Sequence, residues 1–266
     1  MKSITSRENP LFKTLKKLEE SAKDRKTTGK TLLDGEHLIE AYLATGGLPE
    51  LIVLSETTAT GPGANALLKK ITSDLFVVMP DAMLRELSPV KTPTGMIALI
   101  AIPSAKTDSN QADFCVMLED IQDPGNLGSI LRSAAAAGAQ RIYLSKKCAD
   151  AWSPKVLRAG MGAHFCLEIQ ENSDLIKIAD TLKGSIIATS LNANKSLFDL
   201  DLTKQVTFLV GNEGAGLSAQ LEDVATEKVT IPMPGKIESL NAASAASICF
   251  FERVRQISTS IKSCST

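Results

Sequence analysis

The chain has 266 residues and a net charge of −1, and its 44% hydrophobic and 22% charged residues are typical of an ordinary globular protein. Its longest apolar runs, near residues 96–102 and 114–118, are far too short to cross a bilayer, and its first 17 residues lack the apolar core of a signal peptide. Five single cysteines without a CxxC pair disfavour a disulfide framework and a zinc site, so we expect no metal and a reducing, cytoplasmic location.

The N-terminal segment is locally basic, because residues 1–30 contain nine Lys or Arg against four Asp or Glu. Asn9 followed by Pro10 predicts the start of a helix that ends near Gly29. Its lysines lie off the apolar repeat, and this pattern fits an RNA-contacting face and a merely solvated face equally well. The candidate RNA contacts are Lys13, Lys16 and Lys17.

Short strands and helices alternate from residue 31 to residue 102, which predicts a small α/β domain over residues 1–102. His37 follows a strand and a glycine, and a lone histidine at such a place is more often structural than catalytic. Residues 103–113 are small and polar and predict an interdomain linker. The strands are expected at residues 31–34, 50–55, 75–80 and 95–102.

Alternation resumes at residue 114 and predicts a second α/β domain over residues 114–266. The apolar strand runs predict a mostly parallel sheet covered on both faces, with ligands bound past the carboxyl ends of the strands. Asn126 is expected to cap a helix that Gly138 ends, and a long final helix is expected over residues 240–261. The strands are expected at residues 114–120, 141–145, 164–169, 185–190, 207–211 and 228–233.

A glycine-rich loop follows one of these strands, with Gly211, Gly214 and Gly216 in the spacing GxxGxG. A dinucleotide fingerprint has the spacing GxGxxG, so a dinucleotide-dependent oxidoreductase is disfavoured. Glycines let the backbone approach a ligand closely. From the residues alone, a nucleotide-like ligand gripped by main-chain groups and a set of ordinary tight turns remain equally open.

Three stretches taken together are more specific. Asn126-Leu-Gly-x-x-x-Arg132, Gly211-Asn-Glu-Gly-x-Gly-Leu-Ser218, and Ile231-Pro-Met-x-Gly-x-x-x-Ser-Leu-Asn241 resemble, in order and spacing, the three signature motifs of the SpoU (TrmH-like) RNA 2′-O-ribose methyltransferases of the SPOUT superfamily. The resemblance covers residues 112–260, and the N-terminal part resembles more weakly the L30e-like substrate-binding domain that is often fused to these enzymes.

This resemblance implies an α/β catalytic domain with a deep trefoil knot, a homodimer with sites at the subunit interface, and S-adenosylmethionine as methyl donor. The reaction implied is methylation of a ribose 2′-hydroxyl in structured RNA, and ribosomal RNA is the substrate that we favour. The residues that the resemblance assigns to the donor are Thr189, Gly211, Asn212, Ile231, Met233 and Leu240.

The resemblance also assigns catalytic positions. Arg132 is the activating residue by analogy; because arginine stays protonated, we favour positioning of the hydroxyl and a neighbouring phosphate over direct proton removal. Each position has a structural alternative, such as a helix cap for Asn126 or an ion-pair partner for Arg132. The catalytic candidates are Arg132, Asn126, Glu213, Ser239 and Asn241.

Two other functions remain open beside methylation of ribosomal RNA. One is the same reaction on transfer RNA, and the other is a knotted RNA-binding homodimer without turnover. Trp152, the only tryptophan, is expected to fill a hole in the core rather than to stack on a base.

Overall fold

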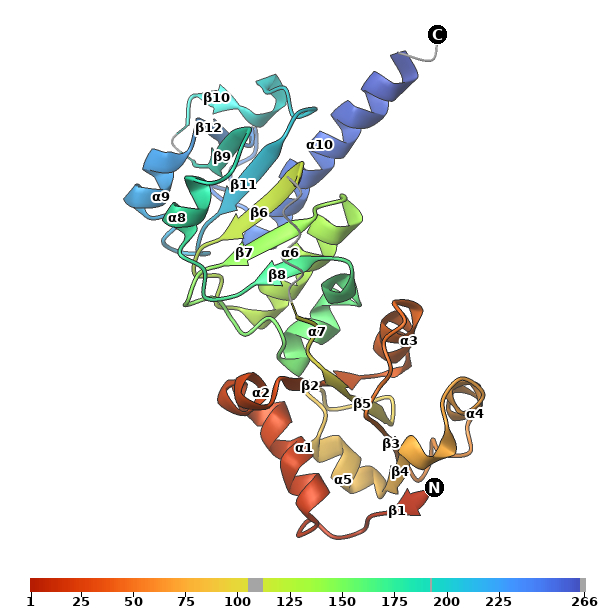
Figure 1. Ribbon diagram of the computed structural model, residues 1–266. Helices are drawn as coiled ribbons and strands as arrows, with labels where there is room; N and C mark the ends of the chain where they lie inside the picture. The colour runs from red at the N-terminus through yellow and green to blue at the C-terminus, as the bar shows by residue number, and fades with distance from the viewer. Residues whose placement is uncertain (105–111, 192, 264–266) are drawn as a thin grey trace. The chain divides into compact units, whose positions relative to one another are not determined.

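The computed structural model describes residues 1–104, 112–191 and 193–263, together with the side chains up to residue 260. Most of the predicted linker, residues 105–111, lies outside the described residues. The chain forms two compact units, the first of Met1–Ser104 with Trp152–Phe165 and the second of Ala105–Ala151 with Cys166–Thr266 (Figure 1). No helix within the described ranges is long and apolar enough to span a membrane.

The first unit is built on a mixed sheet of β1 (Lys2–Ser3), β2 (Lys30–Asp34), β3 (Leu51–Ser55), β4 (Phe76–Met79) and β5 (Met96–Ala101). The strand order is β1-β4-β3-β5-β2, and β5 runs antiparallel to both of its neighbours. The α/β class expected for this part is therefore observed. The helices are α1 (Pro10–Glu20), α2 (Ala22–Thr28), α3 (Glu36–Ala44), α4 (Pro62–Leu68), α5 (Asp81–Glu86) and α7 (Pro154–Gly160).

The predicted N-terminal helix is two helices. Ser21 takes an extended conformation between α1 and α2, and its side chain accepts a hydrogen bond from Asp24 N at 3.1 Å as the cap of α2. The buried residues Phe12, Leu15 and Leu18 of α1 pack against the sheet, which leaves the lysine faces outward. The break is set by Ser21, a residue that favours caps over helix interiors.

The second unit contains a parallel sheet of β6 (Phe114–Leu118), β7 (Arg141–Leu144), β8 (Glu168–Gln170), β9 (Ser185–Thr189), β10 (Lys195–Ser196), β11 (Val206–Val210) and β12 (Glu227–Thr230). The order is β10-β12-β9-β11-β6-β7-β8, and every pair is parallel, which confirms the expected sheet. Residues 164–169 were expected as one strand, but Ala163–Phe165 form a 3-10 turn and β8 begins only at Glu168.

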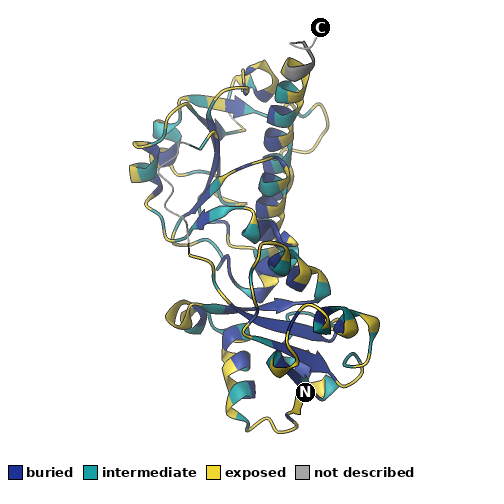
Figure 2. Cartoon of the chain, turned by 45° about the vertical axis from the view of Figure 1, so that its right-hand side comes forward, coloured by how far each residue is buried: buried dark blue, intermediate teal, exposed yellow. Residues whose placement is uncertain are grey.

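Both faces of this sheet are covered, as buried strands require. On one face Cys115, Met117 and Leu209 pack with α8 (Leu175–Ala179) and α9 (Ala219–Val224). On the other face, Phe114, Phe208 and Phe250 form an aromatic cluster with ring centroids 5.6–6.0 Å apart. Phe250 belongs to α10 (Ala242–Ser263), which packs beside α6 (Pro124–Ala136), and the central strands β6 and β11 are buried throughout (Figure 2).

A buried ion pair holds α7 on β2 within the first unit. Arg158 Nη1 donates to Asp34 Oδ2 at 3.0 Å, Ser88 Oγ donates to the same oxygen at 2.7 Å, and the Asp34 side chain is 1% exposed. Burial raises the pKa of Asp34, although Ser88 and Arg158 both act to lower it. Trp152 is buried beside His164, as the hole-filling interpretation expects, and its carbonyl accepts a hydrogen bond from Thr31 Oγ1 at 2.6 Å.

We predict that Arg158→Met lowers the free energy of unfolding of the first unit by about 1–3 kcal/mol, because it leaves the buried carboxylate with one hydrogen-bond donor fewer. The loss is expected to be larger at pH 8 than at pH 5. A raised pKa means that the folded state binds more protons than the unfolded state, so stability falls as pH rises from about 3.9 through the folded-state pKa, and removing Arg158 extends that window upward. Urea unfolding followed by Trp152 fluorescence measures both values.

The double variant Asp34→Asn with Arg158→Met is the control for that experiment. Neither it nor Asp34→Asn alone has a carboxyl group at this position, so the stability difference between these two proteins should not change between the two pH values. An equal loss for Arg158→Met at pH 5 and pH 8 would contradict the assignment of the effect to Asp34.

Candidate functional site

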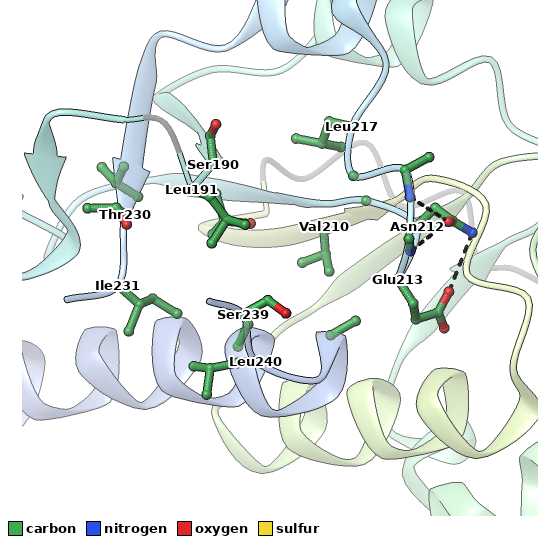
Figure 3. A pocket seen from close by; sticks show the side chains of 18 of the residues that line it. Ser190, Leu191, Val210, Asn212, Glu213, Leu217, Thr230, Ile231, Ser239 and Leu240 are labelled. Atoms are coloured by element: carbon green, nitrogen blue, oxygen red, sulfur yellow. Dashed lines mark hydrogen bonds between the residues drawn. The ribbon is translucent and has the colours of Figure 1, made fainter. Parts of the chain in front are cut away.

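A cavity of about 310 Å³ lies at the carboxyl ends of β9, β11 and β12, beside the start of α10. The register of the parallel sheet creates it, because Val210 of β11 is level with Leu118 of β6 and Val229 of β12 is level with Thr189 of β9. The side chains that surround the hollow therefore come from separate loops (Figure 3). All six residues predicted to hold the donor line it, namely Thr189, Gly211, Asn212, Ile231, Met233 and Leu240.

The loop after β11 is tightly folded around Asn212. Asn212 and Gly216 form an antiparallel bridge with main-chain hydrogen bonds of 3.0 and 2.9 Å. The Asn212 Oδ1 also accepts hydrogen bonds from the main-chain N–H groups of Gly214 at 2.9 Å and Ala215 at 3.0 Å. A Cβ on Gly211 would lie 2.3 Å from the main-chain carbon of Gly216, so only glycine allows this close approach.

A chain of polar side chains joins the three sequence motifs next to the cavity. Asn126 Nδ2 donates to Glu213 Oε1 at 2.9 Å, and Asn241 Nδ2 donates to Asn126 Oδ1 at 2.9 Å. Asn241 Oδ1 in turn accepts from Ala243 N at 2.9 Å and from Ser244 N at 3.2 Å at the start of α10. Because each amide has one side that donates and one that accepts, this chain fixes the orientation of both asparagines.

The structure corrects the expected role of Asn126 as a helix cap. Asp123 caps α6, since its Oδ1 accepts from Asn126 N at 2.7 Å, and Pro124 stands at the first helical position. Asn126 therefore lies in the first turn, where its side chain is available to Glu213. Asn241 caps α10 and also donates a hydrogen bond to Asn126. Its role as a helix cap therefore does not exclude a place in the site.

The catalytic candidates divide into three groups by position. Glu213 and Ser239 line the cavity, whereas Asn126 and Asn241 lie outside the lining but bind to Glu213 directly or through each other. Arg132 is exposed on α6, does not line the cavity, and forms no ion pair with any residue that the structure describes. A single chain thus connects four of the five candidates through the cavity lining or through hydrogen bonds, and Arg132 takes part in neither among the described residues.

The three candidate RNA-contacting lysines lie on α1 of the first unit. Lys13 Nζ is 2.5 Å from Glu8 Oε2, and Lys16 Nζ donates to the Glu86 carbonyl at 2.5 Å while it pairs with Glu20 at 3.1 Å. Lys17 is exposed and has no ion-pair partner within the described part of the chain. Of the three, Lys17 is therefore the one whose charge is available to another molecule.

Sequence reasoning missed several residues of the cavity wall. Ser190 and Leu191 follow Thr189 at the end of β9, Thr230 ends β12, and Glu222 reaches the cavity from α9. The positions of Ser190, Leu191 and Thr230 could have identified them, because residues at and just after the carboxyl ends of parallel strands lie at the same edge of the sheet. Nothing in the sequence pattern distinguishes Glu222 from Asp223, the other charged residue of α9.

Two family models match the chain in separate places. The model of the SpoU rRNA methylase family matches residues 113–251, and that of an MRM3-like substrate binding domain matches residues 9–98. The first match contains all three motif loops of the cavity. The second contains the three lysines of α1.

The chain is also similar to individual proteins along nearly its whole length. It is 35% identical to an uncharacterised tRNA/rRNA methyltransferase of Synechocystis sp., over 96% of this chain and 94% of that protein. It is 32% identical to the 23S rRNA (guanosine(2553)-2'-O)-methyltransferase RlmP of Bacillus subtilis, over 94% and 98%. The crystal structure of the SpoU methyltransferase AviRb of Streptomyces viridochromogenes with AdoMet superposes with a TM-score of 0.83 at 29% identity, over 93% and 98%.

We predict that Gly211→Ala destabilises the second unit by about 1–3 kcal/mol, because the added methyl group displaces the main chain of Gly216 and Leu217. Gly214→Ala is the matched control from the same loop, since its Cβ would have its nearest contact at 3.6 Å, with Asn212 Oδ1, and should change stability by less than about 0.5 kcal/mol. Scanning calorimetry of the three proteins measures the difference. Equal melting temperatures for Gly211→Ala and Gly214→Ala would show that the close approach does not matter.

Proposed function

The chain belongs to the SpoU rRNA methylase family, and from this premise we propose that it transfers a methyl group from S-adenosylmethionine to a ribose 2′-hydroxyl of ribosomal RNA. The observation that carries the proposal is the hydrogen-bond chain Asn241–Asn126–Glu213, which joins all three motifs at the rim of one cavity. The resemblance drawn from those motifs is confirmed by the family match.

The residues of the cavity fit S-adenosylmethionine. Gly211, which has no side chain, lines the cavity with its main chain, and the apolar residues Ile231, Met233 and Leu240 line it from the loop after β12. Polar side chains also line the cavity, with Ser190 and Thr230 at the ends of β9 and β12 and Asn212 and Glu213 on the loop after β11. This mixture of apolar wall and accessible main chain suits a purine ring and a methionine chain. We propose that the six lining residues assigned to the donor hold it.

The bound donor supplies a methyl group on a sulfonium, which is already strongly electrophilic. The task of the protein is therefore to orient a weak nucleophile, and a ribose hydroxyl is found only in RNA. We propose that Glu213, held by Asn126, accepts a hydrogen bond from the ribose, and that Ser239 and Asn241 complete the polar wall. The guanidinium of Arg132 positions the hydroxyl and the adjacent phosphate, and the hydroxyl proton passes to that phosphate or to water.

The position of Arg132 supports a homodimer. Its side chain is exposed on α6, does not line the cavity of its own chain and has no hydrogen bond to the other catalytic candidates among the described residues, whereas Asn126, Asn241 and Glu213 are joined by hydrogen bonds. The neighbouring surface of α10 exposes Phe251, whose side chain is 48% accessible. We propose that two copies associate through α6 and α10 and that each copy provides Arg132 to the site of the other.

The N-terminal unit is proposed to bind the RNA. It matches an MRM3-like substrate binding domain and contains the exposed Lys17. Ribosomal RNA is favoured over transfer RNA by the family description and by the substrate of the Bacillus subtilis relative. The intact catalytic candidates disfavour a binding protein without turnover. We also propose the deep trefoil knot, the domain boundaries at residues 102 and 114, the absence of a metal and a cytoplasmic location.

We predict that the protein transfers tritium from S-[methyl-³H]adenosylmethionine to ribosomal RNA isolated from cells that lack its gene, and that nuclease digestion releases a 2′-O-methylated nucleoside. Arg132→Ala should abolish the transfer and leave the dissociation constant of the donor within about twofold, because the residue does not line the cavity. Sedimentation at twice the chain mass for both proteins tests the homodimer.

The control for this experiment is Lys183→Ala, which removes an exposed cation from the same unit. It should keep the wild-type rate. Label in transfer RNA alone would select the other substrate, and donor binding without label in any RNA would favour the protein without turnover. A parallel loss of donor affinity in Arg132→Ala would exclude the positioning role of Arg132.

We further predict that Lys17→Glu weakens binding of ribosomal RNA several-fold and lowers the slope of log K against log salt by about one unit, as loss of a phosphate contact requires. Lys183→Glu makes the same change of charge at an exposed position of the other unit and should have little effect. Filter binding at several salt concentrations measures both. An unchanged affinity of Lys17→Glu at low salt would remove α1 from the RNA-binding surface.

A further inference from the structure

Asp120 has a left-handed backbone, with φ of 55°, in the loop that leaves β6. Residues other than glycine adopt this conformation seldom, and such residues gather at functional sites. Only Met161 and Asn172 share it among the non-glycine residues of the described chain. Asp120 is thus an unusual residue at the edge of the sheet where the cavity lies.

Ser145, at the end of β7, holds Asp120 in this conformation. Its Oγ accepts a hydrogen bond from Asp120 N at 2.9 Å and donates one to Asp120 Oδ1 at 2.6 Å. Ser145 is itself fixed, because its main-chain N–H donates to the carbonyl of Leu118 at 3.0 Å. One hydroxyl group therefore clamps both the main chain and the side chain of Asp120.

The carbonyl of Asp120 points to the glycine-rich loop. It accepts a hydrogen bond from Asn212 Nδ2 at 2.9 Å, which leaves Asn212 Oδ1 for the main-chain N–H groups of Gly214 and Ala215. The same Nδ2 lies 3.4 Å from Glu213 Oε2. A rotation of the Asp120 peptide would remove the anchor of the Asn212 amide and release the loop that carries Glu213.

The charge of Asp120 has a separate and weaker partner. Lys147 Nζ lies 3.3 Å from Asp120 Oδ2, but the lysine side chain is 75% exposed. An ion pair so open to solvent contributes little. The surrounding residues therefore stabilise the backbone conformation of Asp120 more than they stabilise its charge.

We propose that Asp120 and Ser145 are positioning residues for the methyl transfer: Ser145 locks the left-handed backbone of Asp120, whose carbonyl orients Asn212 and thereby Glu213. The inference rests on the proposed function and extends it to two residues outside the three motifs and outside the cavity lining. The loop after β7 belongs to none of the three motifs, and the proposal gives it the role of holding the loop that contains Glu213 in place.

The first test is Ser145→Ala with Ser145→Thr as the conservative variant. Ser145→Ala should lower kcat about tenfold or more, because small losses of orientation are costly in rate, and should leave the KM for RNA within about twofold. Ser145→Thr keeps a hydroxyl group and should restore kcat. Calorimetry should show that both variants melt close to the wild type, and Lys147→Ala should keep the wild-type kcat.

The second test separates the backbone of Asp120 from its side chain. Glycine adopts a positive φ freely, so Asp120→Gly should keep most of the wild-type kcat, whereas Asp120→Ala should lose as much as Ser145→Ala. In the Asp120→Gly protein, adding Ser145→Ala should cause little further loss. Equal kcat values for Asp120→Gly and Asp120→Ala would overturn the inference, even if Ser145→Ala did not fold.

Amide hydrogen exchange provides a readout that does not need turnover. Ser145→Ala should speed exchange at Gly214 and Ala215, whose N–H groups are held by Asn212, and Ser145→Thr should not. An inactive wild type would refute the proposed function while this exchange result still decides the positioning role. An active wild type with wild-type kcat and exchange in Ser145→Ala would refute the positioning role alone.

Discussion

The direction of the strands is the constraint on which the site depends. All neighbours in the seven-stranded sheet are parallel, so the loops after β6, β9, β11 and β12 leave at the same edge. Residues more than a hundred positions apart, such as Asn126 and Asn241, come within 2.9 Å because each follows or precedes an element at that edge. The aromatic cluster of Phe114, Phe208 and Phe250 fixes α10 against this sheet and so fixes the start of the helix that Asn241 caps.

Much of this sheet can be predicted from the sequence, because strands that are buried on both faces of a parallel sheet consist of continuous apolar residues. The strand at Val206–Val210 and the glycine-rich loop after it can be recognised from the local sequence alone. Local rules fail where two residues compete for one role. Asp123 and Asn126 are both good caps, and only the observed contact between Asn126 and Glu213 shows why Asp123 takes the position. The predicted strand at residues 164–169 is wrong for a different reason: Phe165 packs on Tyr42 within the first unit, whereas the second unit, with β8, resumes only at Cys166.

The candidate site was predictable as a set of loops but not as a network. Motif spacing identifies Gly211, Glu213 and Asn241, yet it carries no information on Ser145 or Asp120, whose importance comes from hydrogen bonds across two loops. A serine at the end of a strand and an aspartate in a loop are ordinary in any sequence. The left-handed backbone of Asp120 becomes visible only when the chain is folded.

The chemistry of the network also bears on what completes the site. Glu213 receives hydrogen bonds from the neutral amides of Asn126 and Asn212, and it has no ion-pair partner among the described residues. Asp123 and Asp120, the latter paired with Lys147, lie in the loop between β6 and Asn126, so acidic groups gather at the rim that we propose a polyanionic RNA approaches. A cation supplied from outside the chain would relieve this repulsion. Arg132 is exposed and lies on the helix that begins next to Glu213, and because arginine side chains carry a positive charge in proteins, the Arg132 that we propose a second copy supplies would balance the charge that a single chain leaves uncompensated.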